Sequence, residues 1–198
     1  GKDVAAGRAK IITGGGSNET AHAMQLARQS EKAGADGNLV VTPYYNKPTQ
    51  AGILTHFRMI ADATDLPVIL YDIPGRTGTR IEAETMIRLA EHPRIVAVKD
   101  CSYDFLAAQK VMHRTELAYY AGCDEHNLAL TAVGGAGCIS TVANVVPERV
   151  RAVLDAVEAG DTPVSARLQQ RATPLIEAMM AAGLPGAVTA KALLGAPG

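Results

Sequence analysis

Short apolar segments alternate with longer amphipathic segments six times along the chain, and this alternation restricts the possible folds more than any other feature. Strand followed by helix, repeated without a break, indicates parallel strands joined by right-handed crossovers. The predicted strands are residues 9–13, 38–42, 67–71, 95–99, 117–120 and 137–141. The predicted helices are residues 19–33, 50–64, 82–92, 104–114, 125–133 and 147–159, followed by 163–182 and 187–194.

Local signals define several of these boundaries. Ser17 and Asn18 are expected to cap the first long helix, and Gly34 to end it. Pro147 suits the first turn of the helix that follows the sixth strand. Residues 72–80 are rich in turn formers and are predicted to be a loop.

The number of units suggests an incomplete barrel. A closed (β/α)8 barrel has eight strand–helix units and typically about 250 residues, whereas this chain has 198 residues and six predicted units. Residues 1–8 look like the end of an earlier unit. We therefore predict an α/β fold, a (β/α)8 TIM barrel lacking its first two units, with the start of a C-terminal helical extension. No linker divides the chain; residues 1–160 would form the partial barrel, and residues 161–198 a helical region packed on it.

An open doubly wound sheet is the alternative fold. That architecture usually has a GxGxxG stretch after its first strand, and none is found here. Gly14-Gly15-Gly16-Ser17 offers glycines but neither a Walker lysine nor a third spaced glycine, so we interpret it as a tight turn between strand and helix.

Composition excludes several functions. With 19 basic and 20 acidic residues the net charge is -1, which gives no electrostatic basis for binding nucleic acid. No apolar run approaches the roughly 20 residues that cross a bilayer, and no signal peptide opens the chain, so we expect a cytoplasmic protein with no membrane partner. Three cysteines without CxxC spacing and five scattered histidines predict no metal site and no disulfide framework.

The fourth predicted strand ends in a lysine. Ile95, Val96, Ala97 and Val98 form an apolar run that suits a strand buried on both faces, and Lys99 follows directly. In α/β barrels this end of a strand faces the active site. Desolvation there favours the neutral amine, which attacks carbonyl carbons. The alternative interpretation is a lysine that extends from the strand end into solvent.

Two neighbouring strands end in further chemically useful groups. Tyr44 and Tyr45 follow the second strand, and Tyr71 and Arg76 follow the third. Because parallel strands end on one rim, these side chains can converge with Lys99: a phenol can relay protons, and a guanidinium matches a carboxylate. Individually, Tyr44 could be a packing residue and Arg76 a surface residue. Together they favour imine chemistry on a small keto acid.

Four stretches resemble a known family: residues 42–48 (TPYYNKP), 71–78 (YDIPGRTG), 98–100 (VKD) and 134–140 (GGAGCIS). They are similar to the 4-hydroxy-tetrahydrodipicolinate synthase (dihydrodipicolinate synthase) family, within the pyruvate-dependent class I aldolase superfamily that includes N-acetylneuraminate lyase. The resemblance covers essentially the whole chain. It implies a lyase that condenses pyruvate with L-aspartate 4-semialdehyde in lysine and diaminopimelate biosynthesis, without a cofactor beyond the covalent imine.

The resemblance also implies roles for particular residues. Lys99 would form the Schiff base with pyruvate, and Tyr71 would relay protons. Tyr45 would match the tyrosine lent across a dimer interface, with Tyr44 packing there, which implies a homo-oligomer, a dimer or a tetramer. Arg76 would hold the carboxylate of the aldehyde substrate. The main-chain carbonyl of Ile139 would face the lysine.

Other positions depart from the family pattern. Asn18, His22 and Tyr44 would be the remnant of an allosteric lysine site in which His22 replaces a carboxylate. Asp72 stands where many members have asparagine. A Gly-Thr-Thr-Gly-Glu stretch that supplies a catalytic threonine is missing from these residues, as are further C-terminal helices, so a fragment is expected.

The resemblance leaves two other functions open. A related aldolase would use the same imine on a different aldehyde, a sugar acid or hydroxyoxoglutarate being examples. An inactive fragment would serve only in assembly with other subunits.

Overall fold

The computed structural model describes residues 1–180 and 183–195. Residue contacts group the chain into two compact units, Gly1–Tyr119 and Tyr120–Gly198. The predicted division at residue 160 remains a prediction. No described helix is both long enough and apolar enough to cross a membrane.

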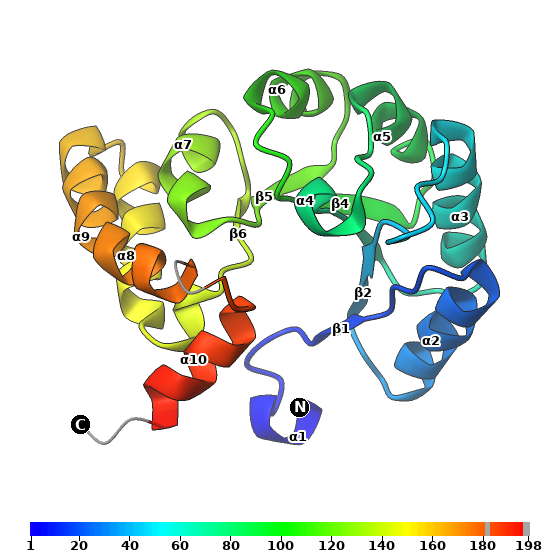
Figure 1. Ribbon diagram of the computed structural model, residues 1–198, viewed down its shortest axis with the longest axis horizontal. Helices are drawn as coiled ribbons and strands as arrows, with labels where there is room; N and C mark the ends of the chain where they lie inside the picture. Colours follow the sequence, from blue (N-terminus) through cyan, green and yellow to red (C-terminus); the bar gives the residue numbers. More distant parts are fainter. Residues whose placement is uncertain (181–182, 196–198) are drawn as a thin grey trace. The chain divides into compact units, whose positions relative to one another are not determined.

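The first unit is built from alternating strands and helices, with two helices after the third strand (Figure 1). Its strands are β1 (Ile12–Gly14), β2 (Gly37–Val41), β3 (Val68–Asp72), β4 (Ile95–Asp100) and the start of β5 (Ala118–Ala121). Its helices are α1 (Lys2–Ala5), α2 (Thr20–Lys32), α3 (Gln50–Asp62), α4 (Pro74–Thr77), α5 (Ala83–Leu89) and α6 (Phe105–Arg114). Strands β1 to β4 pair in parallel and in chain order.

The second unit contains the end of β5, which pairs in parallel with β6 (Gly137–Cys138). Its helices are η1 (Asp124–His126), α7 (Asn127–Ala132), η2 (Val142–Asn144), α8 (Pro147–Glu158), α9 (Thr162–Met180) and α10 (Gly186–Gly195). Helix α9 packs against α8, α7 and α10, around a core that includes Val150, Ile176 and Met179. Each of six parallel strands is thus followed by helix, the connectivity predicted for an incomplete (β/α)8 barrel.

Helices α2, α3 and α5 lie along the outer side of the strands of the first unit (Figure 1). Helix α3 illustrates how the sequence produces this arrangement. Thr49 caps its N-terminus by accepting a hydrogen bond from the Gly52 N–H. Ile53, Phe57 and Ile60, spaced by three and four residues, are fully buried. They cover the strands' own buried residues, among them Val40, Val68, Leu70 and Val98.

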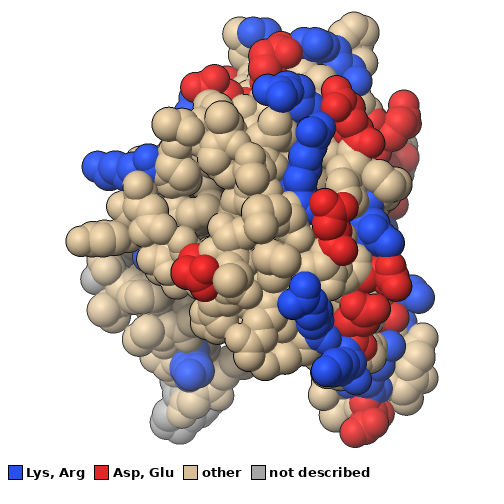
Figure 2. Space-filling model, turned by 90° about the vertical axis from the view of Figure 1, so that its right-hand side faces the viewer, with Lys and Arg blue, Asp and Glu red and all other residues tan. Residues whose placement is uncertain are grey.

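The outer surface of these helices is charged. Ion pairs join neighbouring helices, for example Arg58–Glu91 at 3.0 Å and Arg114–Glu84 at 2.5 Å. Figure 2 shows both signs of charge interspersed on the face that it presents.

Several predicted boundaries were wrong. β1 starts at Ile12 because the Ile11 N–H binds the Asp36 carboxylate, at 2.8 Å, instead of the sheet. Glu19, and not Ser17 or Asn18, caps α2: its carboxylate accepts hydrogen bonds from the N–H groups of Ala21 and His22, at 2.9 and 2.6 Å. Gly34 does follow the helix end in the left-handed conformation, with φ 74°.

Two loops also differ from prediction. Residues 72–80 contain the helical turn α4, with Pro74 at its first position and Gly78 at φ 77° after its end. β6 ends at Cys138, since the Asp124 carboxylate draws the following residues away by binding the N–H groups of Thr141 and Val142. The last two residues of the predicted helix 163–182 lie outside the described residues.

Strand β4 is not buried on both faces, because the Val96 side chain is 40% exposed. The register passes from Val68 opposite Ile95 to Ile69 opposite Ala97. Val96 is therefore the extra residue of a β-bulge, without a partner on β3. Beyond the bulge the register is regular through Lys99 and Asp100.

Candidate active site

Tyr71 and Lys99 occupy partner positions at the ends of β3 and β4. The Lys99 Nζ atom lies 4.2 Å from the centre of the Tyr71 ring. A cation over an aromatic face is attracted by the ring quadrupole, which orients the lysine. The structure therefore brings together the two residues that the sequence placed on neighbouring strand ends.

A pocket of about 480 Å³ opens beside Tyr71, and Lys99 is not one of its lining residues. Its walls include Gly14 and Gly16 from the end of β1 and Val41 from β2. Tyr44, Tyr71 and Arg76 line it as well, so the structure gathers three of the predicted residues around one space. Arg76 is exposed on α4, where its guanidinium is available to an anion entering from solvent.

Gly16 has a steric reason for lining this pocket. A Cβ atom there would lie 2.6 Å from the Val41 backbone nitrogen and 2.7 Å from its Cγ1 atom. A side chain at residue 16 would therefore push against β2. Sequence reasoning recognised these glycines only as a tight turn.

Tyr45 does not line the pocket. Its side chain is 87% exposed, and its backbone has φ 72°, which is uncommon for a residue other than glycine. Its N–H donates to the Thr77 carbonyl at 3.2 Å, which ties the loop after β2 to α4. The expected role of Tyr45 in a neighbouring subunit's site remains a prediction.

Asn18 and His22 lie near the loop that bears Tyr44. The Asn46 side chain donates to the Asn18 carbonyl at 2.6 Å, and the Asn18 amide donates to Asn46 Oδ1 at 3.4 Å. His22 is exposed, and its Nδ1 lies 3.2 Å from the Ser17 hydroxyl. Neither lines the pocket of Tyr71, whereas Tyr44, the third residue of the expected lysine site, does.

Ile139 belongs to the second unit, where its N–H donates to the Ala121 carbonyl at 2.8 Å. The residues after it are fixed by Asp124, which is buried. The Asp124 carboxylate accepts hydrogen bonds from the Ser140 hydroxyl and the Asn127 amide, besides the two backbone N–H groups described above. Sequence reasoning missed Asp124, because its hydrogen-bond donors are contributed by residues 3 to 18 positions away in the chain.

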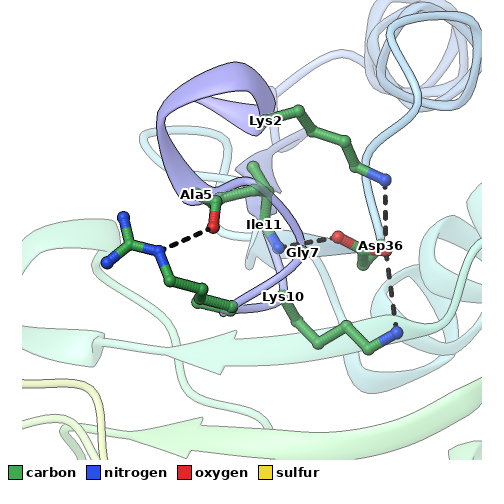
Figure 3. A pocket seen from close by; sticks show the side chains of 8 residues that line it. Lys2, Ala5, Gly7, Lys10, Ile11 and Asp36 are labelled. Carbon is green, nitrogen blue, oxygen red and sulfur yellow. Dashed lines mark hydrogen bonds and ion pairs between the residues drawn. The ribbon is translucent and has the colours of Figure 1, made fainter.

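A smaller pocket of about 230 Å³ lies near the start of the first unit. Figure 3 shows Lys2 and Lys10 reaching Asp36 from two sides, at 3.2 and 3.9 Å. The hydrogen bond from the Ile11 N–H is the main cause that lowers the pKa of Asp36. Asp36 immediately precedes β2, so this cluster lies at the N-terminal ends of the strands, where barrel residues stabilise the fold.

Among residues 1–180 and 183–195, no three His, Cys, Asp or Glu side chains form a group that could hold a metal ion. The expectation of catalysis without metal or cofactor remains a prediction. A tyrosine and an arginine that line a pocket, with a lysine against the tyrosine ring, suit covalent imine chemistry on a carboxylate-bearing carbonyl compound.

The sequence matches the Dihydrodipicolinate synthetase family over residues 1–196, and the chain belongs to this family. It is 66% identical over 191 residues to 4-hydroxy-tetrahydrodipicolinate synthase 1 of Streptomyces coelicolor, covering 96% of this chain and 63% of that protein. It is 49% identical over 199 residues to the 4-hydroxy-tetrahydrodipicolinate synthase of Acidothermus cellulolyticus, covering 99% and 64%.

Structural comparison agrees. A crystal structure of the enzyme from Cyanidioschyzon merolae with lysine bound matches with a TM-score of 0.94 and 39% identity. The match covers 98% of this chain and 66% of that one. The family and the fold class, an incomplete (β/α)8 barrel, are therefore confirmed. The chain spans just under two thirds of the length of these curated relatives.

Proposed function

We propose that this protein is a Schiff-base-forming lyase that condenses pyruvate with L-aspartate 4-semialdehyde to give 4-hydroxy-tetrahydrodipicolinate. The single observation that supports it best is the Tyr71–Lys99 pair, with the Lys99 Nζ 4.2 Å from the centre of the Tyr71 ring, which lines a pocket. The names of the relatives point to the same reaction. The product would enter lysine and diaminopimelate biosynthesis in the cytoplasm.

The first step forms the imine. The neutral Lys99 amine attacks the keto carbon of pyruvate, and the carbonyl oxygen leaves as water after two proton transfers. Tyr71 can carry these protons, since it is the register partner of Lys99 and its ring centre lies 4.2 Å from the Lys99 Nζ atom. Loss of a proton from the pyruvate methyl group then gives an enamine, whose carbon attacks the aldehyde of the second substrate.

The second substrate has a carboxylate, and Arg76 is positioned to bind it. A guanidinium at the pocket wall can donate two parallel hydrogen bonds to that group. The substrate's amino group then displaces the Lys99 amine from the former keto carbon, which closes the ring and releases the enzyme. The resemblance implies that Tyr45 acts in the active site of a second subunit, within a homodimer or homotetramer. It also implies that the main-chain carbonyl of Ile139 faces Lys99.

Borohydride trapping tests the proposal. Reduction in the presence of pyruvate should add one pyruvate-derived group to the full-length protein, and peptide mapping should locate it on Lys99. Lys99→Arg should abolish the adduct, because a guanidinium stays protonated. Lys47→Arg and Lys110→Arg are matched controls that should still be trapped. An adduct on Lys47 or Lys110 would refute the assignment.

Substrate comparison tests the second half of the reaction. The full-length protein should turn over L-aspartate 4-semialdehyde in preference to N-acetylmannosamine. A preference for the sugar would indicate the related aldolase instead. A protein that forms no imine would be the non-catalytic alternative.

A further inference from the structure

Two buried aspartates lie directly behind the Tyr71–Lys99 pair. Asp72 of β3 and Asp100 of β4 are register partners, one step beyond Tyr71 and Lys99. Because successive side chains of a strand point to opposite faces, the aspartates lie on the side of the sheet away from Tyr71 and Lys99. Their side chains are buried, with residue exposures of 0% and 8%. Two carboxylates so placed repel each other, which favours one neutral acid.

Hydrogen bonds assign the charge to Asp100. The Tyr119 hydroxyl donates to its Oδ2 atom at 2.8 Å, and the Ser102 N–H donates to its Oδ1 atom at 2.6 Å. Both oxygens therefore have a donor, and donors favour the ionised form of a carboxyl group. The Tyr119 hydroxyl also lies 3.9 Å from the Met86 sulfur, so α5 covers this side of the pair.

Asp72 has a different environment. Its Oδ1 atom accepts a hydrogen bond from the Ile81 N–H at 3.1 Å. Its Oδ2 atom is buried and has no hydrogen-bond partner among the residues that the structure describes. An unpartnered buried oxygen disfavours the charged form more than the neutral acid.

The groups that face Asp72 from neighbouring elements act in both directions. Burial is the main cause that raises the pKa of Asp72 to about 7. The Ile81 N–H and the Arg80 guanidinium oppose this rise, and the Asp100 charge adds to it. Arg80 is itself paired with Asp104, at 2.7 Å, and the Tyr119 hydroxyl has a raised pKa because it is buried beside Asp100.

We propose that Asp72 is a positioning residue that acts as a neutral carboxylic acid, accepting the Ile81 N–H hydrogen bond at the end of β3 while Asp100 bears the charge of the pair. The proposal rests on the proposed function, because its consequence is felt at Lys99. Ionisation of Asp72 would place a second negative charge opposite Asp100 and push the two strand ends apart. It would also favour the protonated form of Lys99, which is not a nucleophile.

Infrared titration of the full-length protein tests the protonation state without pyruvate chemistry. The wild-type protein should show the carbonyl band of a protonated carboxyl group that is absent from Asp72→Asn and is lost with a midpoint near pH 7. Asp100→Asn removes the repelling charge and should move that midpoint to lower pH. This second variant keeps the proposal testable even if Asp72→Asn does not fold. Absence of a protonated buried carboxyl above about pH 5, where an ordinary aspartic acid is ionised, would overturn the proposal.

The rate of imine formation with pyruvate tests the consequence for Lys99. The ratio of the wild-type rate to the Asp72→Asn rate should fall by up to about tenfold between about pH 6 and pH 8.5, as one added charge opposes loss of the lysine proton. Asp65→Asn, a change at an exposed ion pair with Arg94, should give a ratio that does not vary with pH. A pH-independent ratio for Asp72→Asn would show a structural role only. Failure of all variants to form an imine, with the infrared band intact, would refute the proposed function instead.

Discussion

The Lys99 Nζ atom rests 4.2 Å from the centre of the Tyr71 ring, and the two residues are opposite each other in the β3–β4 register. The ammonium therefore lies against a pocket residue, in contrast to the alternative of a lysine extended into solvent. A nucleophile held in place before substrate binds loses less entropy on reaction. The pairing also means that a change in the register of these strands would move both groups together.

Arg76 should matter more for the aldehyde than for pyruvate. It lines the pocket with Tyr44 and Tyr71, and it is carried by α4 and not by the strand that bears Lys99. In the full-length protein, Arg76→Ala should raise KM for L-aspartate 4-semialdehyde about 10- to 100-fold, the loss expected for a charge-assisted hydrogen bond. The rate of borohydride trapping with pyruvate should change little.

A surface arginine provides the control for that experiment. Arg114 forms an exposed ion pair with Glu84, and Arg114→Ala should leave both KM values unchanged. If Arg76→Ala lowers trapping and raises KM to the same extent, Arg76 has a structural role and the substrate assignment is wrong.

Two glycines beside the pocket should respond differently to the same substitution. Gly16→Ala should destabilise the protein by about 1–3 kcal/mol, since its Cβ would overlap the Val41 backbone. Gly14→Ala should have little effect on stability, because no atom lies within 4 Å of the position of its Cβ. Urea unfolding of the two variants measures both, and equal losses would contradict the steric account.

The contribution of Asp72 to the stability of the protein should fall as pH rises from about 4 to about 7. The folded-state pKa of Asp72 is raised to about 7, above the ordinary value near 3.9, so the folded protein binds the proton more tightly than the unfolded chain in this range. The stabilisation is complete below the unfolded pKa and is lost through the folded one. Its upper limit is about 4 kcal/mol, from about three pKa units.

Comparison with Asp72→Asn isolates this contribution. Relative to the wild type, the variant should gain stability between about pH 4 and pH 7 in urea unfolding, because its amide does not ionise. Asp65→Asn, at a largely exposed side chain, should show no such gain. If the difference in stability between the wild type and Asp72→Asn does not change with pH, Asp72 is ionised in the folded protein throughout this pH range.

Feedback inhibition by lysine should be weak or absent. The resemblance places His22 where lysine-sensitive relatives have a carboxylate, and in the structure His22 is exposed near the Asn18–Asn46 contact. A neutral imidazole adds no charge, and a protonated one would repel the inhibitor's ammonium group. The missing charge-assisted hydrogen bond corresponds to roughly 1.5–3 kcal/mol.

Titration of the full-length enzyme with L-lysine checks this expectation. Half-inhibition at submillimolar lysine would contradict it. His22→Glu should increase sensitivity, whereas His113→Glu, at a histidine near the C-terminal end of α6, should not.

Features encoded by short-range pattern could be predicted from the sequence. The alternation of strand and helix predicted the parallel topology. Strands and helices could be told apart because each has its own spacing of apolar residues along the chain. Lys99 and Tyr71 could be placed together, since both end neighbouring parallel strands. Arg76 was found through its position after Tyr71 and the family resemblance, although the turn of helix around it was not.

Only the tertiary structure determined the polar groups behind the site. Asp72 looked like a loop residue, and its burial depends on Asp100, Ile81 and Tyr119, which lie 9 to 47 residues away in the chain. The same is true of Asp124, which accepts hydrogen bonds from Ser140, Thr141 and Val142 and so ends β6 at Cys138, before its predicted end at residue 141. Hydrophobic periodicity is a local property of the chain, whereas the protonation and pairing of a buried carboxyl group depend on whatever the fold brings against it.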